Sequence, residues 1–395
     1  MEDALKDKFG KDYKVCSRCV SDTSMPSIQF DANGVCSYCK LHETMEQQYP
    51  NGVAGKEIIE KTVEKIKLSG KGKRYDCVIG ISGGRDSTFT LYHLKKWGLK
   101  PLAVHFNDGF GNPIAGESIK KATDKLGVDL RTITSDWRES KDLKLSFLKA
   151  STPDLEQPTD LGIQATLFGA AAKEDVKYII NGHSFRTEGM APLDWFYYDG
   201  KYLQSIQNEF GSIKLKRWSP KKPGFNLSTA HVFYYTVMKG IKVFHPLYNF
   251  DYVRTEADEI LKKELGWTNP GAHYYDDLYQ SLVFYVHRTK FNVDKRRFNY
   301  SGLIRSGQMT RETALKRLSD TYSIEDPKVI DLCIKRLGIT RKDLDEYLSY
   351  PVKSFRDYDT SYNFIKKMRI PVKLACQFGF LPKAIYSKYF ETTLD

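Results

Sequence analysis

The sequence has no apolar run near the roughly 18–20 residues that a membrane-spanning helix needs, and its charged first residues contain no apolar signal-peptide core. We therefore expect a cytoplasmic globular protein that does not act at a membrane. The net charge is +12, yet no five consecutive Lys or Arg residues occur. This surplus favours anionic partners, but it does not distinguish among RNA, a membrane surface and small phosphorylated substrates.

Cysteine is scarce, with 7 in 395 residues, and four of them lie close together near the N-terminus. Cys16 and Cys19 form one C-x-x-C pair, and Cys36 and Cys39 form another. This spacing is typical of a structural zinc site with four thiolates, although an iron–sulfur cluster or redox dithiols are alternatives. The segment "SIQFDANG" between the pairs predicts a hairpin. Because so short a segment buries little core, a metal worth ~10–16 kcal/mol would stabilise its fold.

No cysteine occurs between Cys77 and Cys333. Cys77 falls in a predicted strand and Cys333 in an amphipathic helical pattern, so neither resembles the base-activated nucleophile of a glutaminase.

Strand-like and helix-like segments alternate after an amphipathic helix expected near 55–68. The strand-like segments are 75–81, 101–106, 128–134 and 176–181, and the helix-like segments are 86–97, 113–126 and about 160–174. Such alternation predicts an α/β fold with a doubly wound parallel sheet, whose ligands bind beyond the carboxyl ends of the strands. From residue 301 the pattern is helical, and Thr310 and Thr340 are suited to cap helices there.

The stretch "YDCVIGISGGRDSTFTLYHLKKWG", residues 75–98, places a glycine turn between the first strand and a helix. Gly83 and Gly84 let the chain bend and let a ligand approach the backbone N–H groups. Ser82 and Ser87 add hydroxyl donors beside the helix N-terminus. Backbone amides gathered at such a turn bind anions, so the sequence predicts a phosphate site here.

The Ser-Gly-Gly-x-Asp-Ser turn resembles the pyrophosphatase loop (PP-loop) of the ATP-pyrophosphatase superfamily, which has an adenine nucleotide α-hydrolase-like fold. Members cleave ATP between the α- and β-phosphates and transfer AMP to an oxygen of the substrate. A nitrogen or sulfur nucleophile then displaces that oxygen. The turn differs from the dinucleotide fingerprint and from GxxxxGK[ST], so neither NAD binding nor γ-phosphate transfer is expected.

A narrower resemblance joins the two C-x-x-C pairs, the phosphate loop and "IRSGQMTRE" at 304–312. This combination is similar to the N-acetyl sugar amidotransferases of bacterial surface-polysaccharide pathways, including lipopolysaccharide and O-antigen biosynthesis. These enzymes convert an acetamido group of a nucleotide sugar or a related acidic sugar to an acetamidino group. The likeness covers nearly the whole chain. It implies a four-cysteine zinc-binding module at 1–50, a linker helix at 51–74, a PP-loop domain at 75–250 and a mostly helical region at 251–395.

The resemblance implies ATP, Mg²⁺ and structural Zn²⁺ as cofactors and assigns roles within the loop. The amides of Gly83, Gly84 and Ser87, with the hydroxyls of Ser82 and Ser87, would hold pyrophosphate. Asp86 would act catalytically by orienting the loop or holding the metal. Arg85 occupies a position where relatives more often have Lys, and we place it among the nucleotide-binding residues.

Five further residues are expected at the site. Glu188 follows the fourth strand and is expected to be catalytic, with a loop salt bridge as the alternative. His183 and His105 are expected to contact the nucleotide, although a packed structural histidine explains each equally well. Arg305 and Arg311 are expected to grip a sugar diphosphate or carboxylate bidentately, with exposed helix-start arginines as the alternative.

Relatives in this family obtain ammonia from separate subunits that resemble the glutaminase and barrel subunits of imidazole glycerol phosphate synthase. We therefore expect a glutaminase partner and a nucleotide-sugar substrate, and we do not expect nucleic acid. The main alternative is a tRNA-modifying PP-loop enzyme that thiolates or amidates a base, which the positive charge and the zinc module also fit. Thiolating enzymes that need a catalytic Cys before the fourth strand are excluded because "EQPTDLGIQ" occupies that segment. A zinc-ribbon adaptor would leave the phosphate loop unexplained.

Overall fold

A five-stranded parallel sheet lies at the centre of the computed structural model. The structure describes residues 10–192, 195–219, 224–268, 277–320, 325–377, 386 and 389–390. The strands are β1 (Cys77–Gly80), β2 (Pro101–Asn107), β3 (Leu130–Thr134), β4 (Tyr178–Ile180) and β5 (Lys242–Phe244). Their order is β3-β2-β1-β4-β5, and all neighbours are parallel. The four predicted strands are confirmed, whereas β5 was not predicted.

Helices cover both faces of the sheet, as the alternation of side chains along β1 requires. Cys77 and Ile79 pack in one core with α3, α4 and α5, while Val78 packs on the opposite face with α7. The helices of the first half are α3 (Gly52–Ser69), α4 (Arg85–Lys96), α5 (Pro113–Leu126), α6 (Trp137–Ala150), α7 (Gln157–Lys173), α8 (Phe185–Glu188), α9 (Gly200–Phe210) and α10 (Thr229–Phe233). The predicted doubly wound α/β fold is confirmed.

The N-terminal module contains little regular structure apart from α2 (Ser37–Gln48), which begins directly after Cys36. The predicted hairpin is reduced to one antiparallel bridge, between Phe30 and Cys36. The Asp31 carboxylate accepts hydrogen bonds from the backbone N–H groups of Asn33 and Val35 and so closes the turn. With only this bridge and one between Val15 and Asp22 among its described residues, the module depends on contacts with its neighbours and on the cysteines.

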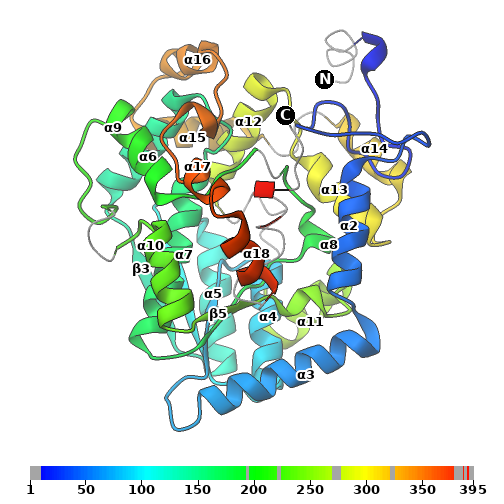
Figure 1. Ribbon diagram of the computed structural model, residues 1–395, viewed down its shortest axis with the longest axis vertical. Coiled ribbons are helices and arrows are strands. Elements are labelled where there is room, and N and C mark those ends of the chain that lie inside the picture. The colour runs from blue at the N-terminus through cyan, green and yellow to red at the C-terminus, as the bar shows by residue number, and fades with distance from the viewer. Residues whose placement is uncertain are drawn as a thin grey trace.

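The second half of the chain is mostly helical, as predicted. Its helices are α11 (Arg254–Leu265), α12 (Tyr279–Phe291), α13 (Arg296–Arg305), α14 (Arg311–Ser319), α15 (Pro327–Leu337), α16 (Arg341–Ser349), α17 (Tyr362–Lys366) and α18 (Arg369–Gln377). Thr310 and Thr340 cap α14 and α16, the latter in a capping box with Asp343. Figure 1 shows α13 and α14 beside α2, although these helices are far apart in the sequence.

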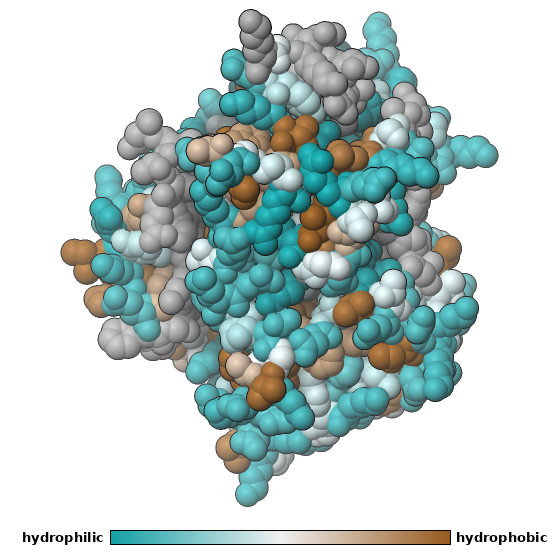
Figure 2. Space-filling view, turned by 90° about the vertical axis from the view of Figure 1, so that its right-hand side faces the viewer, coloured by the Kyte–Doolittle hydropathy of each residue, from teal (hydrophilic) through white to brown (hydrophobic). Residues whose placement is uncertain are grey.

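Among the described helices, none is long and apolar enough to span a membrane. On the face shown in Figure 2, hydrophilic side chains predominate and hydrophobic ones form small separate groups.

Candidate functional site

The phosphate loop lies at the carboxyl end of β1, where α4 begins one residue after Gly84. Gly83 has φ +85°, and a Cβ at this position would lie 2.3 Å from the carbonyl oxygen of Ala115. No other residue therefore fits without a shift of the backbone. The indole N–H of Trp267 donates to the Gly83 carbonyl at 2.9 Å, which holds the turn from outside.

Two predicted hydroxyl residues meet in this loop. The Ser82 and Ser87 hydroxyls are 3.3 Å apart, and the Ser82 N–H donates to the Ser87 hydroxyl over the same distance. The Gly84 N–H donates to the Ser82 hydroxyl. Ser82, Gly84 and Ser87 line a cavity of about 570 Å³, whereas the conformationally constrained Gly83 lies behind its surface. The predicted loop residues are thus brought together at one cavity.

The loop after β4 forms the facing edge of that cavity. A Cβ on Gly182 would lie 2.6 Å from the Ser87 Cα, so the two loops touch through backbone. From β1 the chain continues to β2 and β3 on one side of the sheet, and then crosses to β4 and β5 on the other side. In open parallel sheets, ligands bind where the strand order reverses in this way. The cavity therefore occupies the position expected for a ligand site.

Asp86 lines the cavity and is fixed by two neighbours that the sequence analysis did not identify. The Tyr252 hydroxyl donates to one carboxylate oxygen, and the Thr187 hydroxyl donates to the other at 3.3 Å. Burial and the Asp86 charge raise the pKa of Tyr252 well above its usual range, so this phenol remains a hydrogen-bond donor. The Asp86 carboxylate is thus held by Thr187 from the loop after β4 and by Tyr252 from the segment before α11.

Two arginines also line the cavity near Asp86, and their environments differ. Arg85 forms a two-pronged ion pair with Asp258 on α11, including an Nη2–Oδ2 contact of 2.9 Å. Arg254, at the start of α11, donates from Nη1 to the Asn299 side chain at 3.4 Å. Burial and the nearby Arg85 charge lower the pKa of Arg254. An anion beside Arg254 would relieve both effects, and no periodicity or motif in this part of the sequence marks the residue.

Glu188, His183 and His105 all line the same cavity. His183 Nε2 is 3.5 Å from the Glu188 carboxylate, and its Nδ1 is 3.0 Å from the Tyr248 hydroxyl. Burial lowers the pKa of His183, which favours the neutral ring. His105 Nδ1 lies 2.9 Å from the carbonyl oxygen of Ile81. Each of these residues has a structural partner and also lines the cavity, so the geometry suits both the predicted role at the site and the structural alternative.

A second wall of the cavity carries buried charges that the sequence analysis did not identify. The Lys144 ammonium is 2.8 Å from the Asp108 carboxylate, and both contact the Thr159 hydroxyl at 2.7 Å. Lys295 and Glu156 form another pair, with a nitrogen–oxygen distance of 2.5 Å. Burial alone would lower the pKa of Lys144, but the Asp108 charge outweighs it and raises the pKa.

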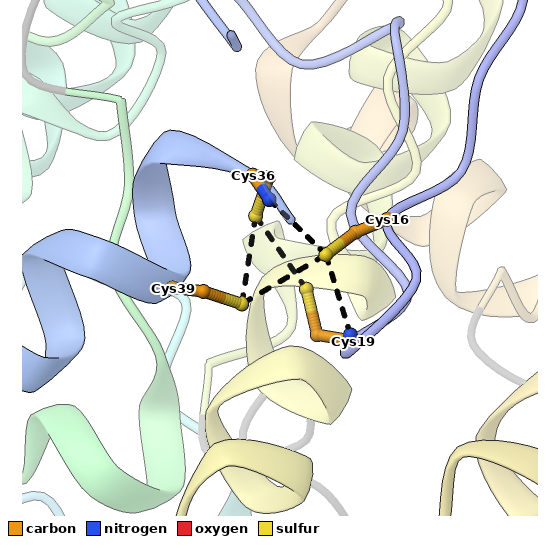
Figure 3. Close-up of side chains that lie close together, drawn as sticks. All are labelled: Cys16, Cys19, Cys36 and Cys39. Carbon is orange, nitrogen blue, oxygen red and sulfur yellow. Dashed lines mark hydrogen bonds between the residues drawn. The ribbon is translucent and has the colours of Figure 1, made fainter. Parts of the chain in front are cut away.

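The four N-terminal cysteines converge, with all sulfurs within 4.8 Å of one another (Figure 3). The S–S distances are 3.9 Å for Cys16–Cys39, 3.7 Å for Cys19–Cys36 and 3.6 Å for Cys36–Cys39. A tetrahedral ion with bonds of about 2.3 Å to sulfur needs S–S distances of about 3.8 Å. The four side chains therefore fit one metal ion. Among the described residues, this is the only group of at least three His, Cys, Asp or Glu side chains with such spacing.

The predicted substrate-binding arginines lie at the cysteine cluster, so that prediction is corrected. The Arg305 guanidinium donates to the sulfurs of Cys19 and Cys39, both at 3.3 Å. Arg311 donates to the carbonyl oxygens of Cys16 and Cys19. Neither arginine lines the cavity. Burial lowers the pKa of Arg305, but the neighbouring thiolates outweigh it and raise the pKa above its ordinary value. The "IRSGQMTRE" segment thus contacts the cysteine module and lies outside the cavity lining.

Other α13 contacts join the cysteine module to the cavity. Arg297 forms an ion pair with buried Asp22 at 3.1 Å, and the Ser301 hydroxyl is 3.1 Å from that of Ser21. On the same helix, Phe298 and Asn299 line the cavity. One helix therefore carries both the anchor to the cysteines and part of the cavity wall.

Residues 272–369 match the family model of the LPS biosynthesis protein WbpG-like, C-terminal domain. The chain is 28% identical over 170 residues to an uncharacterized protein of Methanocaldococcus jannaschii, covering 42% of this chain and 58% of that protein. It is also 28% identical over 108 residues to the tRNA-5-methyluridine(54) 2-sulfurtransferase of Pyrococcus horikoshii, covering 25% and 34%, respectively. The chain thus spans roughly a third to three fifths of these curated relatives.

A solved structure, the U34-tRNA thiolase NcsA from Methanococcus maripaludis with its 4Fe-4S cluster, is 16% identical to this chain. The superposition covers 83% of this chain and 98% of the thiolase, with a TM-score of 0.29. The match at residues 272–369 supports the family predicted from the motifs, because this part of the chain is similar to the C-terminal domain of the WbpG-like LPS biosynthesis proteins.

Proposed function

We propose that the protein is an ATP-dependent amidotransferase that converts an acetamido group of a nucleotide sugar, in particular an acidic one, to an acetamidino group. The observation that carries this proposal is the single cavity that joins the phosphate loop to a second polar wall. A WbpG-like C-terminal domain supports a role in LPS biosynthesis. An enzyme of this class must hold ATP, an amide and a nitrogen donor together, and this cavity offers distinct surfaces for them.

The chemistry begins with an amide, whose oxygen is a very poor leaving group. The amide oxygen attacks the α-phosphorus of ATP, the bond to the bridging oxygen breaks, and pyrophosphate leaves. The resulting O-adenylyl imidate has AMP as a good leaving group. Ammonia attacks the imidate carbon, the carbon–oxygen bond breaks with loss of AMP, and proton release from nitrogen gives the amidine.

The residues of the loop supply the electrostatic part of this reaction. Backbone amides at the N-terminus of α4, together with the Ser82 and Ser87 hydroxyls, would hold the departing pyrophosphate. Arg254 would add a positive charge beside them. Asp86 would hold Mg²⁺, which would neutralise charge on the phosphates when bound. Glu188 and His183 would orient the reacting groups from the facing loop.

We assign the cysteine cluster to structural Zn²⁺, since the observed sulfur spacing suits a single tetrahedral ion. A cluster in which each thiolate binds a different iron would need sulfurs farther apart. We further propose that a separate glutaminase, with a barrel subunit, supplies ammonia. Among the described residues, the cysteines outside the cluster are buried, and burial raises the pKa of Cys77 and Cys333, so neither thiol is activated as a nucleophile.

The first prediction concerns Arg254 and the nucleotide products. With Mg-ATP, ammonium and a diacetamido uronic nucleotide sugar, the protein should form AMP and pyrophosphate. Arg254→Gln should lower kcat/KM for ATP about 10²–10³-fold, because a charged hydrogen bond to the leaving group is lost. Arg254→Lys, which keeps the charge, should lose less, and Asp86→Ala should lose nearly all turnover. ADP and phosphate as products would contradict the proposal.

The alternative function is modification of a tRNA base, which the similarity to a tRNA sulfurtransferase favours over 108 residues. It predicts tight tRNA binding that weakens steeply with salt, and AMP formation that depends on tRNA rather than on a sugar. The same product assay with tRNA in place of the sugar distinguishes the two functions.

A further inference from the structure

The second wall of the cavity carries more negative than positive charge. Five carboxylates line it together with Lys295, and Lys144 lies behind them against Asp108; the carboxylates are those of Asp108, Asp154, Glu156, Asp160 and Asp277. The lysines pair with Asp108 and Glu156. In the part of the chain that the structure describes, no Lys, Arg or His nitrogen lies within 4.0 Å of Asp160 or Asp277. The carboxylates of this wall thus outnumber its lysines, and the excess negative charge is greatest above pH 7, because the pKa of Asp160 and of Asp277 is about 7. This excess attracts a cation.

Gln157 provides a second, independent sign of a ligand at this wall. Its side chain lines the cavity although only 2% of the residue is exposed. Its amide N–H donates to the Asp199 carbonyl at 3.0 Å. The Gln157 Oε1 atom, by contrast, has no hydrogen-bond partner among the described residues. A buried acceptor left without a donor is costly, so this oxygen is matched to a donor that comes from the cavity.

The first turn of α7 places three acceptor side chains together. Glu156 precedes this helix and Gln157 begins it. Asp160 follows Gln157 by three residues and Glu156 by four, and side chains at these spacings are neighbours on a helix surface. The Tyr198 hydroxyl, from outside the helix, offsets part of the rise in the pKa of Asp160. All three residues line the cavity that also contains the phosphate loop.

The chemistry of this wall selects its ligand. It needs a small cation that donates several hydrogen bonds. Divalent metals are disfavoured because the carboxylates do not converge on one point, the four cysteines being the only metal-like group among the described residues. We propose that Glu156, Gln157 and Asp160 form a binding site for ammonium, the nitrogen donor of the reaction; this inference rests on the proposed function. Ammonium has four N–H donors and one positive charge, which match an amide oxygen and two carboxylates.

The site would also convert ammonium to the nucleophile. An N–H proton passes to the Asp160 carboxylate, which leaves neutral ammonia and a neutral carboxylic acid. Burial and the Glu156 charge raise the pKa of Asp160 to about 7, so this group can accept a proton near neutral pH. The nitrogen lone pair is then free to attack the adenylylated carbon in the same cavity. The proton returns to solvent when the next ammonium ion binds.

Thermal unfolding of the whole chain, without ATP or sugar, tests the site apart from the reaction. At a fixed total chloride of about 0.1 M, ammonium should raise the Tm by about 2 °C over sodium. Potassium and Mg²⁺ should not reproduce this shift. Asp160→Asn should abolish it, Gln157→Leu should reduce it at least twofold, and Asp86→Asn at the phosphate loop should retain it. Because Gln157→Leu keeps all charges, it serves if Asp160→Asn fails to fold.

An equal shift with potassium or Mg²⁺ would overturn the ammonium assignment in favour of a general cation site. A shift retained in both Asp160→Asn and Gln157→Leu, or no shift in the parent protein, would also overturn it. Failure of the proposed amidotransferase reaction leaves a different signature, because AMP formation would then be missing while the ammonium shift persists.

Discussion

Asp160 and Asp277 are the carboxyl groups whose surroundings most oppose their charge. Burial is the largest cause that raises the pKa of each group. The Glu156 charge adds to it at Asp160 and the Asp108 charge at Asp277, so each pKa rises to about 7. In the folded protein these groups therefore bind protons that the unfolded chain releases at lower pH. Their contribution to stability is complete below the ordinary carboxyl pKa of about 4 and is lost as pH rises to about 7.

Asp160→Asn should remove one part of this loss. The quantity to compare is the free energy of unfolding of the variant minus that of the parent, in buffer without ammonium. This difference should be about 1–2 kcal/mol larger at pH 8 than at pH 5. Urea unfolding at the two pH values measures the difference. Asp345→Asn, on the exposed side of α16, is the control and should show no such change. A parent protein that gains stability relative to Asp160→Asn as pH rises would contradict this description of the wall.

The sequence motifs identified the residues whose chemistry is local. Ser82, Gly83, Asp86 and the cysteine pairs could be predicted because their neighbours along the chain define the site. Arg254 and Tyr252 could not, since they reach the loop only through the packing of α11 and the segment before it against α4. Arg305 and Arg311 were misassigned for the same reason. A charged motif predicts an anionic partner, and here that partner is the cysteine cluster rather than a substrate.

At the scale of elements, α13 links two sites that the sequence keeps apart. Its C-terminal end donates through Arg305 to the thiolates, and its central residues line the cavity. A buried guanidinium beside several thiolates offsets the negative charge that four sulfurs impose on a divalent ion. We therefore expect metal binding to hold α13 against α2 and to fix the cavity wall.

Arg305→Gln should lower the affinity for Zn²⁺ about 10–100-fold, as measured by competition with a chromogenic chelator. Arg305→Lys retains a positive charge and should lose less. Amide exchange over α13 should become faster in Arg305→Gln and in the metal-free Cys36→Ser variant. Unchanged zinc affinity in Arg305→Gln would show that this arginine only fills space beside the cluster.

Whether a strand or helix could be predicted depended on its length and on how continuous its apolar pattern is. β1 and β2 are apolar runs bounded by turns and were predicted, whereas β5 has only three residues, two of them exposed, and lies at the sheet edge. Helix α6 was missed although its Asp136 cap is ordinary, because buried Lys144 and Asp142 interrupt its apolar face. Lys144 pairs with Asp108 at the cavity wall, whereas Asp142 accepts hydrogen bonds from Gln207 and Ser212 away from it.

At the scale of the whole molecule, one cavity has two chemically opposite ends. In the proposed reaction, phosphate would bind at the loop, where N–H groups and Arg254 gather, and the nitrogen donor would bind at the carboxylate wall. The overall charge of +12 does not predict this arrangement, because the local excess at the second wall is negative. The acetamido carbon would lie between the two ends, within reach of both reactions.

The most direct test of the central claim follows one oxygen atom. The acetamido oxygen of the nucleotide sugar is labelled with ¹⁸O, and the protein is given Mg-ATP and ammonium. If the amide oxygen attacks the α-phosphorus, mass spectrometry should find ¹⁸O in the AMP and none in the acetamidino sugar. Label found in pyrophosphate or phosphate, or AMP released without label while the sugar is aminated, would contradict the adenylyl-transfer mechanism.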